Sequence, residues 1–179
     1  CVGPVDPITL IDTWSDSLTV TDNCNMITWS NDFMGLTGGC GGLTGLATVT
    51  YTASDGCGNA SSVTLNFTVN DTNDPNIIVG AIDTMVVCDG TGKNANLFDW
   101  LDNRAGASAS DVCTDDATIV ETLLLGTTNV GYQDIQDSLN VLLANGCGAS
   151  ITVRFAFTDA CGNTSTTDAE FVITDNVDP

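Results

Sequence analysis

A group of four cysteines that occurs twice in the same order constrains this chain more than any other feature. Residues 53–75, which contain ASDGCGN, have a counterpart in residues 158–179, which contain TDACGN. Cys57 and Cys161 within these segments lie 104 positions apart. A fixed spacing between similar segments indicates two copies of one folding unit. The sequence therefore predicts a chain of two tandem repeats.

Each repeat contains four cysteines, and the two sets match in order. The matched residues are Cys1 and Cys88, Cys24 and Cys113, Cys40 and Cys147, and Cys57 and Cys161. We place the domains at residues 1–75 and 76–179, with an unmatched insert in the second from about residue 121 to 143. Residues 77–87 read as a first strand, whose counterpart is missing from the first repeat or lies upstream of it. An even number of regularly spaced cysteines, in a chain without histidine, predicts disulfides and an extracytoplasmic location.

Thr- and Val-rich runs with alternating character predict β-hairpins near the end of each repeat. These runs cover residues 47–53, 62–69, 151–157 and 168–174. One short helix per repeat is expected, because Leu97, Trp100 and Leu101 have helical spacing and Trp14 occupies a similar place in the first repeat. We expect Trp14 and Trp100 to fill equivalent core positions. Trp29 is interpreted as the core tryptophan of a central strand, with a sugar-binding surface as the alternative.

The charge balance excludes several partners. The chain has three basic residues against 23 acidic ones, for a net charge of -20. Nucleic acids and anionic lipids are recognised through Lys and Arg, so we expect neither as a partner. No apolar run is long enough for membrane insertion. Nearly all the acids are Asp, which suits turns and oxygen cages for hard cations.

The hairpin sequence YTASDGCGN…FTVNDTNDP, the TDNC before it and the segment VVCDGTG…FDWL…ASDVC resemble a known family. They are similar to the hyalin-repeat (HYR-like) DxCGN domains of large Bacteroidetes cell-surface and gliding adhesins. The resemblance implies an immunoglobulin-like β-sandwich. Together with the internal repeat, the helical spacing and the cysteines, it predicts an all-β fold of two tandem immunoglobulin-like β-sandwich repeats, each with a short helical insert and two disulfides. It also implies surface exposure and an adhesive or spacer role, and it supplies no catalytic residues.

An immunoglobulin-like sandwich would bring the loop before its third strand and the loop of its last hairpin to the same end. This topology predicts the pairs Cys24–Cys57, Cys113–Cys161, Cys1–Cys40 and Cys88–Cys147. Sequence alone leaves 105 connectivities for eight cysteines open. Asp residues lie two positions before the cysteines of the first two pairs, so disulfide formation would bring carboxylates together.

The linker between the repeats is the strongest candidate for a cation site. We expect Asp71, Asn73 and Asp74 of the linker to face Asp111 and Asp159, and their oxygens suit Ca²⁺. The alternative is a set of Asp- and Asn-rich turns without metal. Two further pairs would serve neighbouring junctions of the same kind. Asp22 and Asp55 would meet a linker upstream, and Asp175 and Asp178 would meet the next repeat.

The sequence predicts a structural or adhesive module of a large extracellular surface adhesin or filament, not an enzyme. Expected partners are neighbouring repeats, surface polysaccharide, or other copies in a filament. The alternative is a carbohydrate-binding accessory module of a secreted multidomain enzyme. Ser17, Thr84 and Ser138 follow aspartates in a short pattern that resembles a bacterial O-glycosylation motif. The absence of histidine and the use of cysteine in disulfides argue against catalysis.

Overall fold

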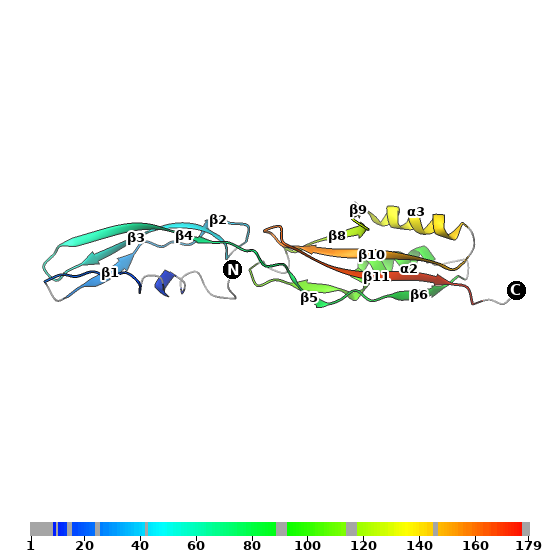
Figure 1. The fold of residues 1–179 in the computed structure, drawn as a ribbon, viewed down its shortest axis with the longest axis horizontal. Helices are drawn as coiled ribbons and strands as arrows, with labels where there is room; N and C mark the ends of the chain where they lie inside the picture. The colour runs from blue at the N-terminus through cyan, green and yellow to red at the C-terminus, as the bar shows by residue number, and fades with distance from the viewer. Residues whose placement is uncertain are drawn as a thin grey trace. The chain divides into compact units, whose positions relative to one another are not determined.

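The computed structural model of the chain describes residues 9, 11–13, 16–23, 26–41, 43–88, 93–113, 118–144 and 147–176. Within these residues the protein is mostly β-sheet with a few short helices, as expected (Figure 1). Two compact units are present. The first contains Cys1–Asn73 with Val112–Asp115, and the second contains Asp74–Asp111 with Asp116–Pro179. None of the described helices is long and apolar enough to cross a membrane.

The first unit is built on one antiparallel sheet. Its strands are β1 Thr28–Asn31, β2 Thr37–Gly38, β3 Gly45–Ser54 and β4 Ala60–Val69. Strand β3 pairs with all three other strands, and its pairing with β4 runs from Gly45↔Val69 to Ser54↔Ala60. This long register confirms the hairpin predicted from the alternating runs.

One face of this sheet is buried, because side chains alternate between the two faces of a strand. Ala47, Val49 and Tyr51 of β3 are buried, whereas the residues between them are more exposed. Ile11, which lies in a helical segment at residues 11–13, packs against them and is 1% exposed. The Tyr51 hydroxyl donates a hydrogen bond to the Ile11 carbonyl at 3.4 Å. Trp14, expected in this core, lies outside the described residues.

Trp29 was predicted to be a core residue of a central strand, and this prediction was wrong. Trp29 lies in β1, which within the described residues pairs with β3 alone. Its cross-strand neighbour is the small side chain of Ala53, and the tryptophan is 46% exposed. A short edge strand leaves its large side chain without cover on one side.

The second unit contains a five-stranded sheet in the order β6-β11-β10-β8-β9 and a two-stranded sheet of β5 and β7. The bounds are β5 Asn76–Val79, β6 Thr84–Val87, β7 Ser108–Ser110, β8 Val120–Leu125, β9 Thr128–Val130, β10 Ala149–Thr158 and β11 Thr164–Thr174. The β10–β11 hairpin pairs from Ala149↔Ile173 to Thr158↔Thr164, which confirms the second predicted hairpin.

Residues 77–87 were predicted as one strand, but they contribute to two strands in different sheets. Strand β5 pairs antiparallel with β7, and β6 pairs parallel with β11. Hydrogen bonds to β11 hold the segment that connects β5 to β6. The Ala81 N–H donates to Thr167 Oγ1 at 3.0 Å, and Asp83 Oδ1 accepts the Glu170 N–H at 2.8 Å.

The second unit has more helix than predicted. The expected helix near Trp100 is α2, Lys93–Asp102, and a 3₁₀ turn, η1 Arg104–Gly106, follows it. The unmatched insert forms most of β8, all of β9 and a further helix, α3 Tyr132–Leu143. The expectation of one helix in this repeat was therefore wrong. Helix α3 is held by tertiary packing, since Ile135 and Leu139, one turn apart, are almost fully buried.

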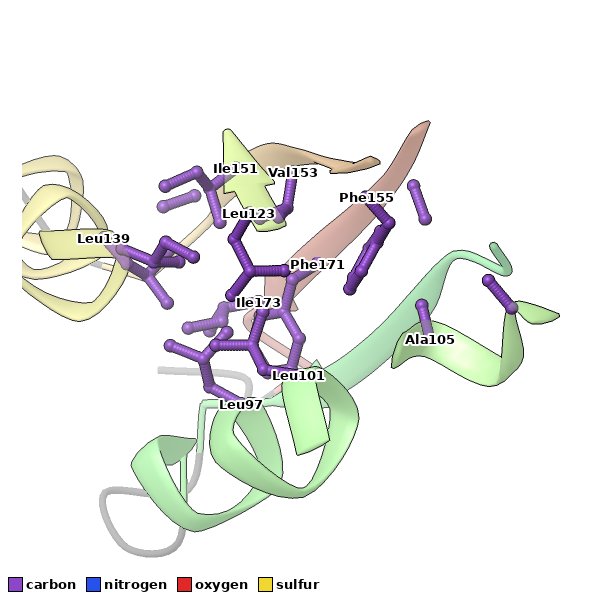
Figure 2. Close-up of a cluster of buried hydrophobic side chains, with 14 of the residues drawn as sticks. Leu97, Leu101, Ala105, Leu123, Leu139, Ile151, Val153, Phe155, Phe171 and Ile173 are labelled. Carbon is purple, nitrogen blue, oxygen red and sulfur yellow. The ribbon is translucent and has the colours of Figure 1, made fainter. Parts of the chain in front are cut away.

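The core of the second unit lies between the helices and the inner face of the large sheet. Figure 2 shows Leu97 and Leu101 of α2 projecting toward Phe171 and Ile173. The Trp100 ring contacts Phe155 and Phe171 at centroid distances of 5.6 and 5.5 Å, and its Nε1–H donates to the Ile82 carbonyl at 3.0 Å. Trp100 therefore takes the core role expected of it.

Candidate functional site: the aspartate-anchored hairpins and the linker

The loop of the β10–β11 hairpin closes around one carboxylate. Asp159 is 4% exposed, and its Oδ1 accepts the backbone N–H groups of Cys161 at 2.8 Å and Asn163 at 2.9 Å. Its Oδ2 accepts Asn163 Nδ2 at 2.8 Å. Gly162 has φ +92, a conformation that glycine adopts without strain. These contacts turn the chain tightly and leave the carboxylate well satisfied.

The β3–β4 hairpin of the first unit is built in the same way. Asp55 Oδ1 accepts the N–H groups of Cys57 at 2.9 Å and Asn59 at 2.8 Å. Its Oδ2 accepts Asn59 Nδ2 at 2.8 Å, and Gly58 again has φ +92. Two units of one chain thus use the same hydrogen bonds at the same place in the hairpin. The repeated Asp-x-Cys-Gly-Asn sequence therefore encodes this loop.

The same hydrogen bonds lower the pKa values of both carboxyl groups. Hydrogen bonds from Asn59, and from the backbone of the loop, lower the pKa of the Asp55 carboxyl below its ordinary value. Burial raises the pKa of Asp159, but bonds from Asn163 and the N–H groups of Cys161 and Gly162 outweigh burial and lower it overall. Hydrogen bonds to a charged form favour that form. Both carboxylates are therefore ionised at neutral pH.

Asp55 and Asp159 were predicted as cation ligands, and their role in the hairpin loops was not predicted. A carboxylate offers about four acceptor positions, and each of these uses three for its own loop. The missed partners are Asn59 and Asn163. The Gly-Asn that follows both cysteines was the signal, because Gly permits the turn and Asn returns to the aspartate.

Disulfides engage all the described cysteines. The bond between Cys88 and Cys147 is one of the four predicted pairs, and it joins residues separated by 59 positions. The other described cysteines, Cys40, Cys57, Cys113 and Cys161, are also disulfide-bonded. Cys1 and Cys24 lie outside the described residues, so the pairs Cys1–Cys40 and Cys24–Cys57 stay predictions. The pair Cys113–Cys161 stays one as well.

The linker residues divide into a buried aspartate and exposed neighbours. Asp71 is 8% exposed, and its Oδ1 accepts the Asn73 N–H at 3.1 Å. Its Oδ2 is buried and accepts no hydrogen bond within the described part of the chain. Asp74 is exposed, and its Oδ1 accepts the Thr164 N–H at 3.2 Å, at the start of β11.

The remaining candidate positions are more open. Asp111 is half-buried, whereas Asp22 and Asp175 are exposed, and Asp178 lies outside the described residues. Asp22 and Asp55 line the same cavity of the first unit, so the structure brings this predicted pair to one place.

The candidate O-glycosylation residues differ in accessibility. Ser17 is exposed in a turn, Thr84 is half-buried in β6, and Ser138 is half-buried in α3. The Ser138 hydroxyl donates to the Asp134 carbonyl at 2.8 Å, so a hydrogen bond within α3 already engages it.

One atom of the described linker residues, Asp71 Oδ2, is buried without a hydrogen bond. A buried carboxylate oxygen without a hydrogen bond is costly, and a bound cation would offset that cost. Ca²⁺ takes oxygen ligands from carboxylates, amides and carbonyls, which the linker sequence supplies in Asp71, Asn73 and Asp74. Asp71 Oδ2 is the atom that would hold it.

No protein-family model matches this chain, and no curated protein matches it. Three solved structures show some similarity. PcdhgB3 EC1-4 is 14% identical, with 72% of this chain and 32% of that chain covered and a TM-score of 0.33. Protocadherin gammaB7 EC3-6, described as a cis-dimer, is 10% identical, with 82% and 41% covered and a TM-score of 0.33. Mouse clustered PcdhgC3 EC1-3 is 13% identical, with 74% and 44% covered and a TM-score of 0.35.

The chain spans less than half the length of each of these three structures. At such TM-scores the likeness establishes neither a common fold nor a common function for this chain. The aspartate-anchored hairpins, the disulfides and the linker are therefore the basis for its function.

Proposed function

We propose that this protein is a structural and adhesive module of a large extracellular surface protein or filament, made of two tandem immunoglobulin-like repeats. The observation that carries the proposal is the loop built twice around Asp55 and Asp159 with the same set of hydrogen bonds. Arrays of one small repeated unit are typical of proteins that span distance or present a surface. The HYR-like sequence resemblance supports the same role.

Disulfides support an extracellular location. All the described cysteines are bonded, and disulfides persist in oxidising compartments. The net charge of -20 disfavours nucleic acid and anionic membrane surfaces as partners. The proposed partners are neighbouring repeats, with self-association in a filament or contact with surface polysaccharide.

The acidic residues are architectural in this proposed function, and the chain has no enzymatic role in it. Perturbed carboxyl groups are common at active sites. Here the lowered pKa values of Asp55 and Asp159 have a structural cause, because both groups are engaged by the backbone and the asparagine of their own loops. The ion pair of Arg154 with Asp168, at 2.7 Å on the exposed side of the second hairpin, explains the lowered pKa of Asp168 in the same manner.

Calcium at the linker is part of the proposed function. Its support is the buried Asp71 Oδ2, which lacks a hydrogen bond from the described residues. A cation bound only by the folded protein stabilises it by about 2.7 kcal/mol when its concentration is a hundredfold above the dissociation constant. Ca²⁺ shared by oxygens of a short linker would also restrict the motion of one repeat against the next.

Thermal melts and small-angle scattering of the whole chain in Ca²⁺ and in EDTA test this proposal. We expect Ca²⁺ to raise the melting temperature. We also expect it to narrow the range of maximum molecular dimensions that the scattering reports for the chain. Asp71→Asn should abolish both effects, whereas the control Asp168→Asn, on an exposed strand face, should retain them. Identical melting and scattering in Ca²⁺ and EDTA would refute the calcium-stiffened junction.

A further inference from the structure

The described residues of the first unit leave a groove open on the inner face of its sheet. Two adjoining cavities of about 120 and 170 Å³ lie there, and Val20, Ala53 and Ser61 line both. Trp29 and Val63 line the second cavity. All these residues come from the first unit, on the segment before β1 and on strands β1, β3 and β4.

The groove exposes large apolar side chains on the face that should be the core. Trp29, Ala53 and Ser61 are cross-strand neighbours, so they share the face that buries Val49 and Tyr51. Trp29 is 46% exposed, Val63 42% and Val20 37%. Exposed apolar residues gathered around one hollow mark a place for a partner.

The second unit shows what covers the corresponding place. Matching Cys24 with Cys113 sets Val20 at the position of Ala109 in β7. There, β5 pairs antiparallel with β7, and Ile77 lies opposite Ala109. Ile77 and Ala109 are both partly buried and pack against the main core cluster. The described residues of the first unit contain no strand equivalent to β5.

The residues that precede β5 make a second matching contact. Pro75 is fully buried, and Asp74 Oδ1 accepts the Thr164 N–H at 3.2 Å. Matching Cys57 with Cys161 sets Ala60 at the position of Thr164. Ala60 lines the groove beside Asp55 and Asn59, at the end where an arriving aspartate would meet its N–H.

We propose that this groove is a receptor site for a β-strand with the chemistry of residues 74–79, supplied by an adjoining repeat. The incoming segment begins with Asp-Pro, caps the Ala60 N–H with its carboxylate, and pairs antiparallel with Thr19–Thr21. Its apolar residue, equivalent to Ile77, lies opposite Val20 and covers Trp29. Strand addition of this kind takes affinity from main-chain hydrogen bonds and specificity from side-chain pockets.

This inference rests on the tandem-repeat assignment of the proposed function, but it does not depend on calcium. Residues 74–87 lead directly to Cys88, the counterpart of Cys1. Copying this 14-residue segment in front of Cys1 therefore supplies a strand equivalent to β5 at high effective concentration. The matched control carries the same extension, with aspartate in place of the isoleucine copied from Ile77.

Fluorescence of Trp29, isolated as the difference from a Trp29→Phe chain, reports occupation of the groove. We expect the extension to shift Trp29 emission to shorter wavelength and to reduce acrylamide quenching severalfold, and the control extension to do neither. As a second measurement, a synthetic peptide of residues 74–87 should produce a saturable shift with the unextended chain. Val20→Asp should abolish this shift.

Unchanged Trp29 emission and quenching in both formats would overturn the strand site. Saturable quenching by neutral oligosaccharides, with no response to the extension or the peptide, would also overturn it and would identify a carbohydrate site instead. All these measurements are made in EDTA. A negative result therefore counts against the groove alone, while the Ca²⁺ melts separately test the junction.

Discussion

Replacing Asp159 by asparagine separates an architectural aspartate from a metal ligand. The substitution keeps the size of the side chain but removes its charge. In the wild type, Asn163 Nδ2 donates to Asp159 Oδ2 at 2.8 Å. In the variant, an amide N–H₂ takes the place of Oδ2, so two donors face each other and this hydrogen bond is lost. The bonds from the Cys161 and Asn163 N–H groups lose their ionic character.

Hydrogen bonds to a charged group each contribute about 1.5–3 kcal/mol, and such contributions are not additive. Losing one bond and weakening two should therefore destabilise the second unit by about 2–4 kcal/mol. For a domain of this size that corresponds to a melting temperature lower by roughly 10–25 °C. The decrease in melting temperature should be the same in Ca²⁺ and in EDTA, because the hydrogen bonds of Asp159 lie within its own loop.

The assay is thermal unfolding of chains that carry Trp14→Phe and Trp29→Phe, followed by the emission of Trp100, which packs against Phe155 and Phe171 in the core of the second unit. The matched control is Asp168→Asn on the same hairpin. Its carboxylate pairs with Arg154 on an exposed surface, so its loss should cost at most about 1 kcal/mol. The reasoning fails if Asp159→Asn melts like the wild type, or if its defect appears only in the presence of Ca²⁺.

Three further predictions concern the disulfide, the core and the acid stability of the second unit. Replacing Cys88 and Cys147 together by serine should cost about 4 kcal/mol in the loop-entropy model for a separation of 59 residues, measured by urea unfolding. Phe155→Ala should cost about 3–5 kcal/mol in the same assay, because Phe155 is fully buried, and a cost below 1 kcal/mol would contradict the packing in Figure 2. Because the pKa of Asp159 is lowered in the folded state, its ionisation stabilises the fold above the unfolded-state pKa of about 4. This stabilisation is lost as pH falls through the folded-state pKa. The free energy of unfolding should therefore decrease less steeply with falling pH in Asp159→Asn than in the wild type.

Local patterns were enough to predict the hairpins. Alternation along residues 47–53 and 151–157 fixed which side chains face inward, and the structure buries Val49, Tyr51, Val153 and Phe155 accordingly. The Cys88–Cys147 bond was predicted from the immunoglobulin-like topology together with the repeated cysteine order. These features depend on neighbours in sequence or on strong internal symmetry.

Long-range packing decided the features that the sequence analysis missed. Helix α3 depends on burial of Ile135 and Leu139, and the split between β5 and β6 depends on contacts to β7 and β11. Trp29 looked like a core residue by its position after Cys24, but its cover is absent from the described part of the first unit. The loop role of Asp159 required Asn163, four residues away, to fold back onto it.

Pulling single molecules of the whole chain tests the central claim, that this is a disulfide-held structural module, most directly. The Cys88–Cys147 bond removes a separation of 59 residues from the extensible length, about 200 Å of stretched chain. We predict discrete unfolding events for the oxidised chain, and at least that much additional extension after reduction or in the Cys88→Ser, Cys147→Ser chain. Smooth extension at low force, with the same total length before and after reduction, would contradict the account.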